Sequence, residues 1–102
     1  MVNTAPDQER ADDEFIVECF WPGVSIADVD ELDRRTRAVA RRARRRGVPV
    51  HYLGSILVPG DEVVLFEFLA GSADAVIATS VEAGIPFQRV VPAMRSPMEV
   101  TP

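Results

Sequence analysis

The stretch that decides the fold reads Phe15-Ile16-Val17-Glu18-Cys19-Phe20-Trp21 and ends at Pro22-Gly23. Its bulky and β-branched side chains are typical of a β-strand, and the Pro-Gly pair stops the strand. Alternate side chains of a strand point to opposite faces of a sheet. Both faces of this strand are therefore mostly apolar, and one of them carries the carboxylate of Glu18.

Length and composition limit the classes of protein to which this chain can belong. Its 102 residues suffice for one domain with one core. The net charge of -5 argues against a nucleic-acid partner, because phosphate binding needs a basic surface. No apolar run reaches the roughly 20 residues of a membrane span, and the N-terminus lacks the apolar centre of a secretory signal. We therefore expect a cytoplasmic protein without nucleic-acid or membrane partners.

Cysteine and lysine usage exclude several kinds of chemistry. The single cysteine, Cys19, excludes an intrachain disulfide and a site of several thiolates within one copy. Every basic side chain is an arginine, so a lysine Schiff base and a lysine general base are also excluded.

The clearest helix is predicted from Ser25 to Arg46. Ser25 is a good N-cap, Asp28 follows at capping-box spacing, and Gly47 is expected to end the helix. Apolar or small residues recur at intervals of three and four and predict one buried stripe. The stripe consists of Ile26, Val29, Leu32, Thr36, Val39, Ala40 and Ala43. We interpret the arginine-rich last turns as a solvated helix end rather than an anion-binding patch, because the chain is acidic overall.

Two strands follow this helix. They are predicted at Val48–Val58 and Glu62–Ala70, and Pro59-Gly60-Asp61 joins them as an antiparallel hairpin. Pro49 lacks an amide hydrogen, which places the first of these strands at a sheet edge or the proline at its first residue.

A second helix and a last strand complete the predicted elements. The helix begins at the N-cap Ser72 and ends at Gly84, and the strand runs from Phe87 to Met94. Pro92 interrupts this strand, which again indicates a sheet edge. The inner side of the helix is expected to carry Ala73, Val76, Ile77, Ser80 and Val81.

The order strand, helix, strand, strand, helix, strand favours an α+β, ferredoxin-like βαββαβ fold. Such a fold has a four-stranded antiparallel sheet, with the first and third strands in the middle and two helices on one face. We expect it to span residues 14–95, with a disordered leader at 1–13 and a flexible tail at 96–102.

Helices cover only one face of such a sheet, yet the two central strands offer apolar side chains to both faces. One set contains Phe15, Val17, Cys19, Trp21, Val64, Phe66 and Phe68. The other set contains Ile16, Phe20, Val63, Leu65 and Leu69. An apolar patch left in water usually marks an interface. We therefore expect a homodimer packed sheet to sheet, with a pocket for a small-molecule ligand between the copies.

Four short motifs in sequence order resemble a widespread group of small bacterial proteins of the dimeric α/β-barrel superfamily. These motifs are Phe15-Ile16-Val17-Glu18 before Pro-Gly, Gly47-Val48, the stretch from Ala70 to Val76, and Gly84-Ile85-Pro86. The resemblance spans Glu14 to Arg95 and implies a dimeric α/β barrel. The group is largely of unknown function, includes nickel-binding proteins of actinobacteria, and is distantly similar to muconolactone isomerases and small polyketide cyclases.

The chain departs from the nickel-binding members in its histidine content. Those members use several histidines, whereas this chain has one, His51. A symmetric dimer would supply two imidazoles, so Glu18, Glu67 or Cys19 would have to complete a nickel site. We therefore expect neither a bound metal ion nor a cofactor.

Five residues are candidates for chemistry in the pocket. Glu18 and Glu67 lie on strands that should be neighbours, and paired carboxylates in apolar surroundings can serve as general acid and base. His51 and Tyr52 are adjacent, so strand alternation lets only one of them face the pocket. Arg89 could neutralise a carboxylate or hold an anionic substrate. The alternative for each is a structural role, with Glu18 and Glu67 paired to Arg89 and His51 solvated.

Two hypotheses for function follow. In the first, which leans on the superfamily resemblance, the protein is a cofactor-independent isomerase or cyclase. It would act by proton transfer on a small, largely apolar carbonyl or polyketide-like metabolite. In the second, it is a non-catalytic accessory protein whose dimer pocket binds a ligand or a metal such as nickel.

Overall fold

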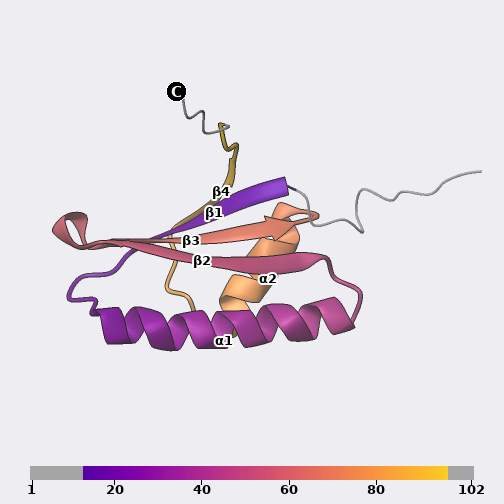
Figure 1. Ribbon diagram of the computed structural model, residues 1–102, viewed down its shortest axis with the longest axis horizontal. Coiled ribbons are helices and arrows are strands. Elements are labelled where there is room, and N and C mark those ends of the chain that lie inside the picture. Colours follow the sequence, from indigo (N-terminus) through magenta and orange to yellow (C-terminus); the bar gives the residue numbers. More distant parts are fainter. Residues whose placement is uncertain (1–12, 97–102) are drawn as a thin grey trace, which may run out of the picture.

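The computed structural model describes residues 13–96, which form a single four-stranded sheet with two helices (Figure 1). The elements are β1 (Asp13–Phe20), α1 (Ile26–Arg45), β2 (Val50–Val58), the 3-10 turn η2 (Pro59–Asp61), β3 (Val63–Ala70), α2 (Ala73–Ala83) and β4 (Arg89–Ala93). The strand order is β2-β3-β1-β4, and every neighbouring pair is antiparallel. This arrangement confirms the predicted ferredoxin-like fold.

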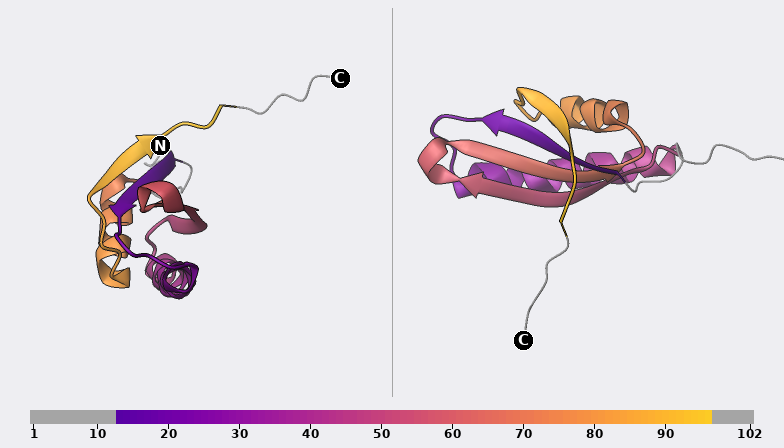
Figure 2. Two further views of the ribbon diagram at one scale, coloured as in Figure 1. Left: turned by 90° about the vertical axis from the view of Figure 1, so that its left-hand side faces the viewer. Right: turned by 90° about the horizontal axis from the view of Figure 1, so that it is seen from above.

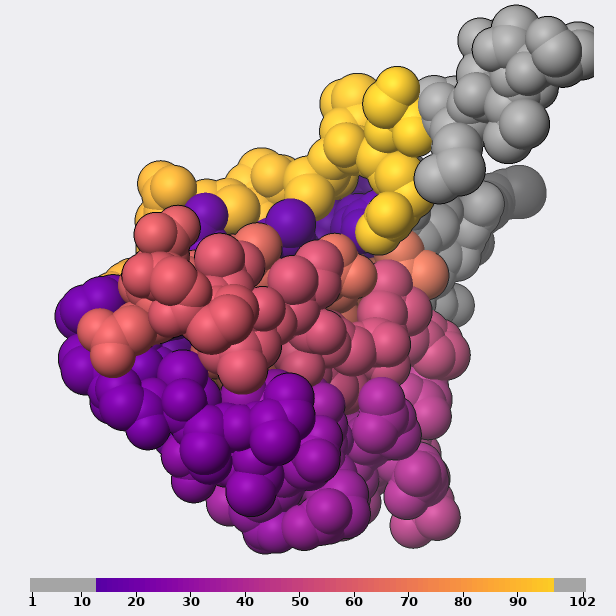
Figure 3. All heavy atoms as spheres, turned by 60° about the vertical axis from the view of Figure 1, so that its left-hand side comes forward, coloured from indigo at the N-terminus to yellow at the C-terminus, as the bar shows by residue number. Residues whose placement is uncertain are grey.

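The two helices lie on the same side of the sheet, as the two further views show (Figure 2). The β2–β3 hairpin, coloured pink to salmon, lies between β4 and α1 in the space-filling view (Figure 3). Except for Asp13, which begins β1, and Ser96, the predicted leader and tail lie outside the described residues. Neither helix combines the length and the apolar character needed to cross a membrane within the described part of the chain.

Capping fixes the start of α1 as the sequence predicted. The Asp28 amide donates to Ser25 Oγ at 3.1 Å, and the Ser25 amide donates to Asp28 Oδ2 at 3.0 Å. Gly47 has a φ of 88° and follows the last turn. The buried stripe is as predicted except for Ile26, which is 64% exposed. At 3.6 residues per turn, Ile26 lies about a quarter turn from the centre of the stripe, so it misses the sheet.

The prediction for the buried side of α2 was partly wrong. Val76 and Ser80 are buried as expected, and the Ser72 cap and the left-handed Gly84 are confirmed. Ile77, Val81 and Ala73 are exposed, whereas Thr79 and Ala83 are buried in their place. The observed positions 76, 79, 80 and 83 keep helical spacing. These four positions form the buried face of α2, and Ile77 and Val81 lie outside it.

The core lies between the helices and the covered face of the sheet. The alternation predicted for the central strands is confirmed, because Val17 and Cys19 on β1 and Phe66 and Phe68 on β3 are fully buried. Trp21 follows β1 and packs against this core while remaining partly exposed.

Tyr52 brings a phenolic hydroxyl group into this core. Its hydroxyl donates to the carboxylate of Asp33 on α1, and Ser55 Oγ donates to the same carboxylate at 2.9 Å. The Arg37 guanidinium lies 5.3 Å from the centre of the Tyr52 ring. Burial, followed by the hydrogen bond to Asp33, raises the pKa of Tyr52 well above its ordinary value of 10.0. Burial likewise raises the pKa of the Cys19 thiol above 9.0.

These two shifts predict that alkaline pH destabilises the fold. Above pH 9.0 for Cys19 and 10.0 for Tyr52, the unfolded state releases protons that the folded state retains. The free energy of unfolding should therefore fall as the pH rises, with a slope approaching about 1.4 kcal/mol per pH unit for each group. Urea unfolding across this range measures the slope, and no lysine titrates in it because the chain has none.

Matched variants separate the two groups. Tyr52→Phe should retain only the contribution of the thiol, and Cys19→Ala should retain only that of the phenol. An unchanged alkaline slope in Tyr52→Phe would contradict the assignment of the phenol as a titrating group.

Candidate functional site

The helix-free face of the sheet, here called the open face, is the candidate functional site. Strand register arranges its side chains in rows that follow the order β2, β3, β1, β4. These rows are His51, Leu69, Glu14 and Ala93; Gly54, Glu67, Ile16 and Val91; Ile56, Leu65, Glu18 and Arg89; and Val58, Val63 and Phe20. The face predicted from alternation for β1 and β3 is therefore confirmed.

Apolar side chains occupy most of the open face. Ile16, Leu65 and Leu69 on the central strands are only half-buried, although they lie in the middle of the domain. Phe20 is 54% exposed and Ile56 is 47% exposed. A single copy thus leaves these apolar side chains partly exposed to water, with Glu14, Glu67 and Glu18 among them.

Glu18 is paired with Arg89. Arg89 Nε donates to Glu18 Oε1 at 2.6 Å, and Nη2 donates to Oε2 at 3.2 Å. This two-pronged hydrogen bond raises the pKa of Arg89. Both oxygens of Glu18 are therefore occupied by Arg89, which is the pairing expected for a structural role of these two residues.

Glu67 is held more loosely than Glu18. Arg95 Nη2 lies 2.7 Å from Glu14 Oε2 but 3.8 Å from Glu67 Oε1, which is beyond hydrogen-bond distance. The hydrogen bond to Glu14 raises the pKa of Arg95. Within residues 13–96, the Glu67 carboxylate has no hydrogen-bond partner, and its side chain is 21% exposed.

An irregularity in β2 leaves open space beside Glu67. The register shifts between Tyr52 and Gly54, so Leu53 forms a bulge and Gly54 lies opposite Glu67. Gly54 has a φ of 140°, and no atom lies within 4 Å of where its Cβ would be. Bulges commonly lie next to active sites, and a glycine in a strand permits close approach of a ligand.

The structure resolves the alternative that the sequence left open for His51 and Tyr52. His51 is exposed on the open face, opposite Leu69. Tyr52 is 8% exposed on the helix-covered face, so the sheet separates it from Glu18 and Glu67. Of the five candidates, the open face therefore brings together Glu18, Glu67, His51 and Arg89.

The described part of the chain does not assemble a set of metal ligands. Residues 13–96 contain no group of three or more His, Cys, Asp or Glu side chains placed to hold a metal ion. Cys19 is buried on the other side of the sheet, where its Sγ donates to the carbonyl of Pro86 at 2.9 Å.

Comparison with known proteins identifies the fold alone. No model of a known family and no curated protein matches the chain. The crystal structure of SCO4226 from Streptomyces coelicolor A3(2) resembles it with a TM-score of 0.68, over 82% of this chain and 99% of that chain. The two sequences are 16% identical, so this similarity supports the ferredoxin-like fold, and the superfamily resemblance stays a prediction.

Three parts of the site were missed by sequence reasoning. Glu14 continues the alternation of Ile16 and Glu18, and the period of two along β1 could have placed it on the open face. Arg95 follows the last strand, where no periodic pattern applies. Gly54 interrupts the sequence of the predicted strand, but its position opposite Glu67 depends on the bulge.

The backbone at Gly54 generates a stability prediction. Gly54→Ala should lower the free energy of unfolding by about 1–2 kcal/mol, because a side chain is strained at this φ although it has room. The urea midpoint at unchanged slope measures the loss. Gly60→Ala is the control, since Gly60 has open space and no positive φ, and equal losses in both variants would contradict the argument.

Proposed function

We propose that the chain acts as a homodimer whose two open faces pack together and enclose a cavity for a small, largely apolar carbonyl metabolite. The observation that carries this proposal is the combination of an uncovered apolar sheet face with carboxylates on its two central strands. Burying the apolar side chains favours association by about 25 cal/mol per Å² of apolar surface. Lost translational and rotational freedom opposes it.

The position of the charges favours a hollow interface over a dry one. Glu14 and Glu18 lie on β1, on either side of Ile16, and Glu67 lies opposite Ile16 on β3, so the three carboxylates form a triangle on the two central strands. A dry interface would remove these carboxylates from water, which costs several kcal/mol per ion even when the ions are paired. A cavity above these three carboxylates avoids this desolvation while the surrounding apolar residues still make contact.

Glu67 is the residue best placed for proton transfer in this cavity. Unlike Glu18, it has no hydrogen bond within residues 13–96, and the space beside Gly54 lets a substrate approach it. A carboxylate base would remove a proton from a carbon next to the carbonyl group and return it elsewhere, which is the step of an isomerase or a cyclase. His51 lies on the neighbouring strand β2, one row from Glu67, and would hydrogen-bond the carbonyl oxygen as negative charge develops on it, whereas Arg89 lies two strands away on β4 and would assist through its pair with Glu18.

Non-catalytic ligand binding is the second candidate. The two-pronged Glu18–Arg89 pair favours it, because a carboxylate with both oxygens occupied is suited to a fixed wall rather than to proton transfer. In this case the cavity would bind the same apolar class of molecule without turnover. A nickel site would require ligands from both copies, since one copy brings only His51 as an imidazole.

The dimer is tested by placing a charge on the open face. Ile56→Glu should raise the dimer dissociation constant at least about 100-fold, equivalent to about 2.7 kcal/mol, because the carboxylate would be buried at the interface. Sedimentation velocity across a concentration series measures it. The control is Ile77→Glu on the outer side of α2, where the side chain is 39% exposed. A wild-type protein that stays a single subunit at high concentration would remove the cavity and the roles assigned within it.

Proton transfer is tested by exchange into deuterated water. Wild-type protein should catalyse loss of the α-protons of 2-tetralone, followed by proton NMR, and Glu67→Gln should slow this exchange by about 100-fold or more. Glu82→Gln, a surface carboxylate on α2 paired with Arg42, is the matched control and should retain the rate.

Three outcomes would count against proton transfer by Glu67. An equal rate in wild type and Glu67→Gln would contradict its role. Saturable binding of 2-tetralone without exchange would favour the binding protein, and stoichiometric nickel retained after purification would favour the metal-binding form of that alternative.

A further inference from the structure

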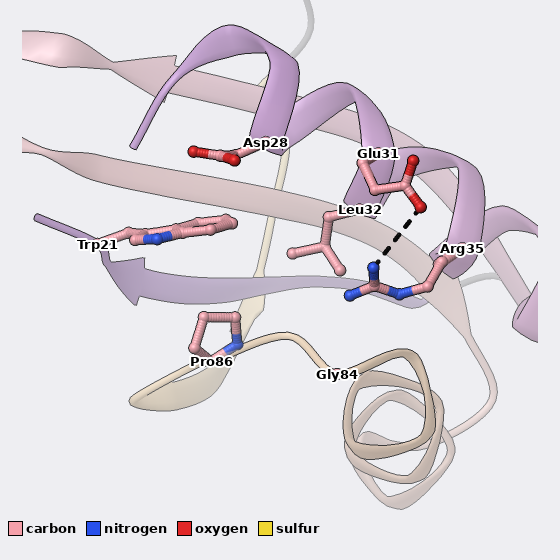
Figure 4. Close-up of a pocket in the computed structure, with 7 residues that line it drawn as sticks. All are labelled: Trp21, Asp28, Glu31, Leu32, Arg35, Gly84 and Pro86. Carbon is pink, nitrogen blue, oxygen red and sulfur yellow. Dashed lines mark ion pairs between the residues drawn. The ribbon is translucent and has the colours of Figure 1, made fainter. Parts of the chain in front are cut away.

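A pocket lies on the helix-covered side of the domain, opposite the open face. It has a volume of about 250 Å³ and is bounded by α1, the β1–α1 connection and the α2–β4 connection (Figure 4). Its lining residues are Trp21, Asp28, Glu31, Leu32, Arg35, Gly84 and Pro86. None of them belongs to the open face, so the pocket is independent of the proposed dimer cavity.

The apolar walls of this pocket are held in place by the fold. Leu32 is 1% exposed and forms part of the core. The Trp21 backbone amide donates to the carbonyl of Glu62 at 2.8 Å, which ties the tryptophan to the hairpin turn. The Pro86 carbonyl accepts from Cys19 Sγ. In Figure 4 the indole, the leucine side chain and the proline ring surround the same space. The pocket is therefore formed before any ligand binds.

Arg35 supplies the polar group of the pocket. Its Nε donates to the carbonyl of Ala83 at 3.0 Å, at the end of α2, and this bond fixes the guanidinium. Nη1 lies 3.8 Å from Glu31 Oε2, too far for a hydrogen bond. Within residues 13–96, neither Nη1 nor Nη2 has a hydrogen-bond acceptor. The outer edge of the guanidinium thus keeps donors for a ligand.

The carboxylates around the pocket are already engaged. Asp28 Oδ2 accepts from the Ser25 amide in the capping box, at the positive end of the α1 dipole. Glu31 Oε1 is bonded by Arg34. The side chain of Arg35 is 51% exposed, so its Nη1 and Nη2 donors face solvent and can be reached by a ligand. A planar anion meets them best, since a guanidinium binds a carboxylate through two parallel hydrogen bonds.

We infer that this pocket binds a small monocarboxylate with an aromatic or branched aliphatic body. The carboxylate would accept from Nη1 and Nη2 of Arg35, and the body would pack against Trp21, Leu32 and Pro86. Glu31 opposes this binding, because its carboxylate competes for the same guanidinium.

Benzoate is the probe for the test. Trp21 is the only tryptophan of the chain, so one indole N–H resonance in a nitrogen-15 NMR spectrum reports on the pocket. Benzoate should shift this resonance saturably, benzyl alcohol should bind more weakly, and benzylamine should not bind. Arg35→Gln should weaken benzoate binding by about tenfold or more. Glu31→Gln should strengthen it severalfold.

Arg41→Gln is the matched control, because it removes one arginine from the same helix outside the pocket. Its benzoate affinity should equal that of the wild type. Equal affinities in Arg35→Gln and Arg41→Gln, or equal binding of benzylamine and benzoate to the wild type, would overturn the inference. The comparison of probes needs no variant and decides the matter even if Arg35→Gln fails to fold. Neither result depends on dimerisation or on exchange at Glu67.

Discussion

The structure depends on the apolar side chains that β1 and β3 present to both faces of the sheet. These strands are the central pair in the order β2-β3-β1-β4, so their side chains cannot be moved to an edge. The two helices cover one set and bury it completely at Val17, Cys19, Phe66 and Phe68. The second set has no cover within the chain described here. The domain thus completes its core on one side of the sheet only.

The order of the strands also determines where acidic and basic side chains lie on the open face. The carboxylates of Glu14, Glu67 and Glu18 project from the central strands, whereas Arg89 and Arg95 come from β4 and the residues after it. Basic groups therefore reach in from one edge of the sheet. Glu18, next to β4, is fully paired, and Glu67, one strand further away, is not. A carboxylate on the strand next to β4 is therefore held in an ion pair, and the carboxylate one strand further away can interact with a ligand.

Much of the fold could be predicted because its signals are local. The capping box of Ser25 and Asp28, the left-handed Gly84 and the alternation along β1 depend on neighbours within a few residues. These signals gave the element order, and the order gave the topology. Ile77 was misplaced because apolar character was taken as a sign of burial, whereas the buried face of α2 consists of Val76, Thr79, Ser80 and Ala83.

The candidate site could be predicted only where it follows strand alternation. Glu18 and Glu67 were placed by that rule. The gap beside Glu67 arises from a bulge at Leu53, which sequence periodicity does not reveal. The pocket around Arg35 was missed because it joins residues far apart in sequence, such as Trp21 and Pro86.

Both outer strands carry features that hinder chain-to-chain growth of the sheet. Pro92 deprives β4 of a main-chain donor, and the bulge at Leu53 disturbs the regular hydrogen-bonding row of β2. A strand of a neighbouring molecule would find no regular row of main-chain hydrogen-bonding groups along either edge strand. These features oppose edge-to-edge association of sheets into fibres. The apolar open face can still pack against another sheet.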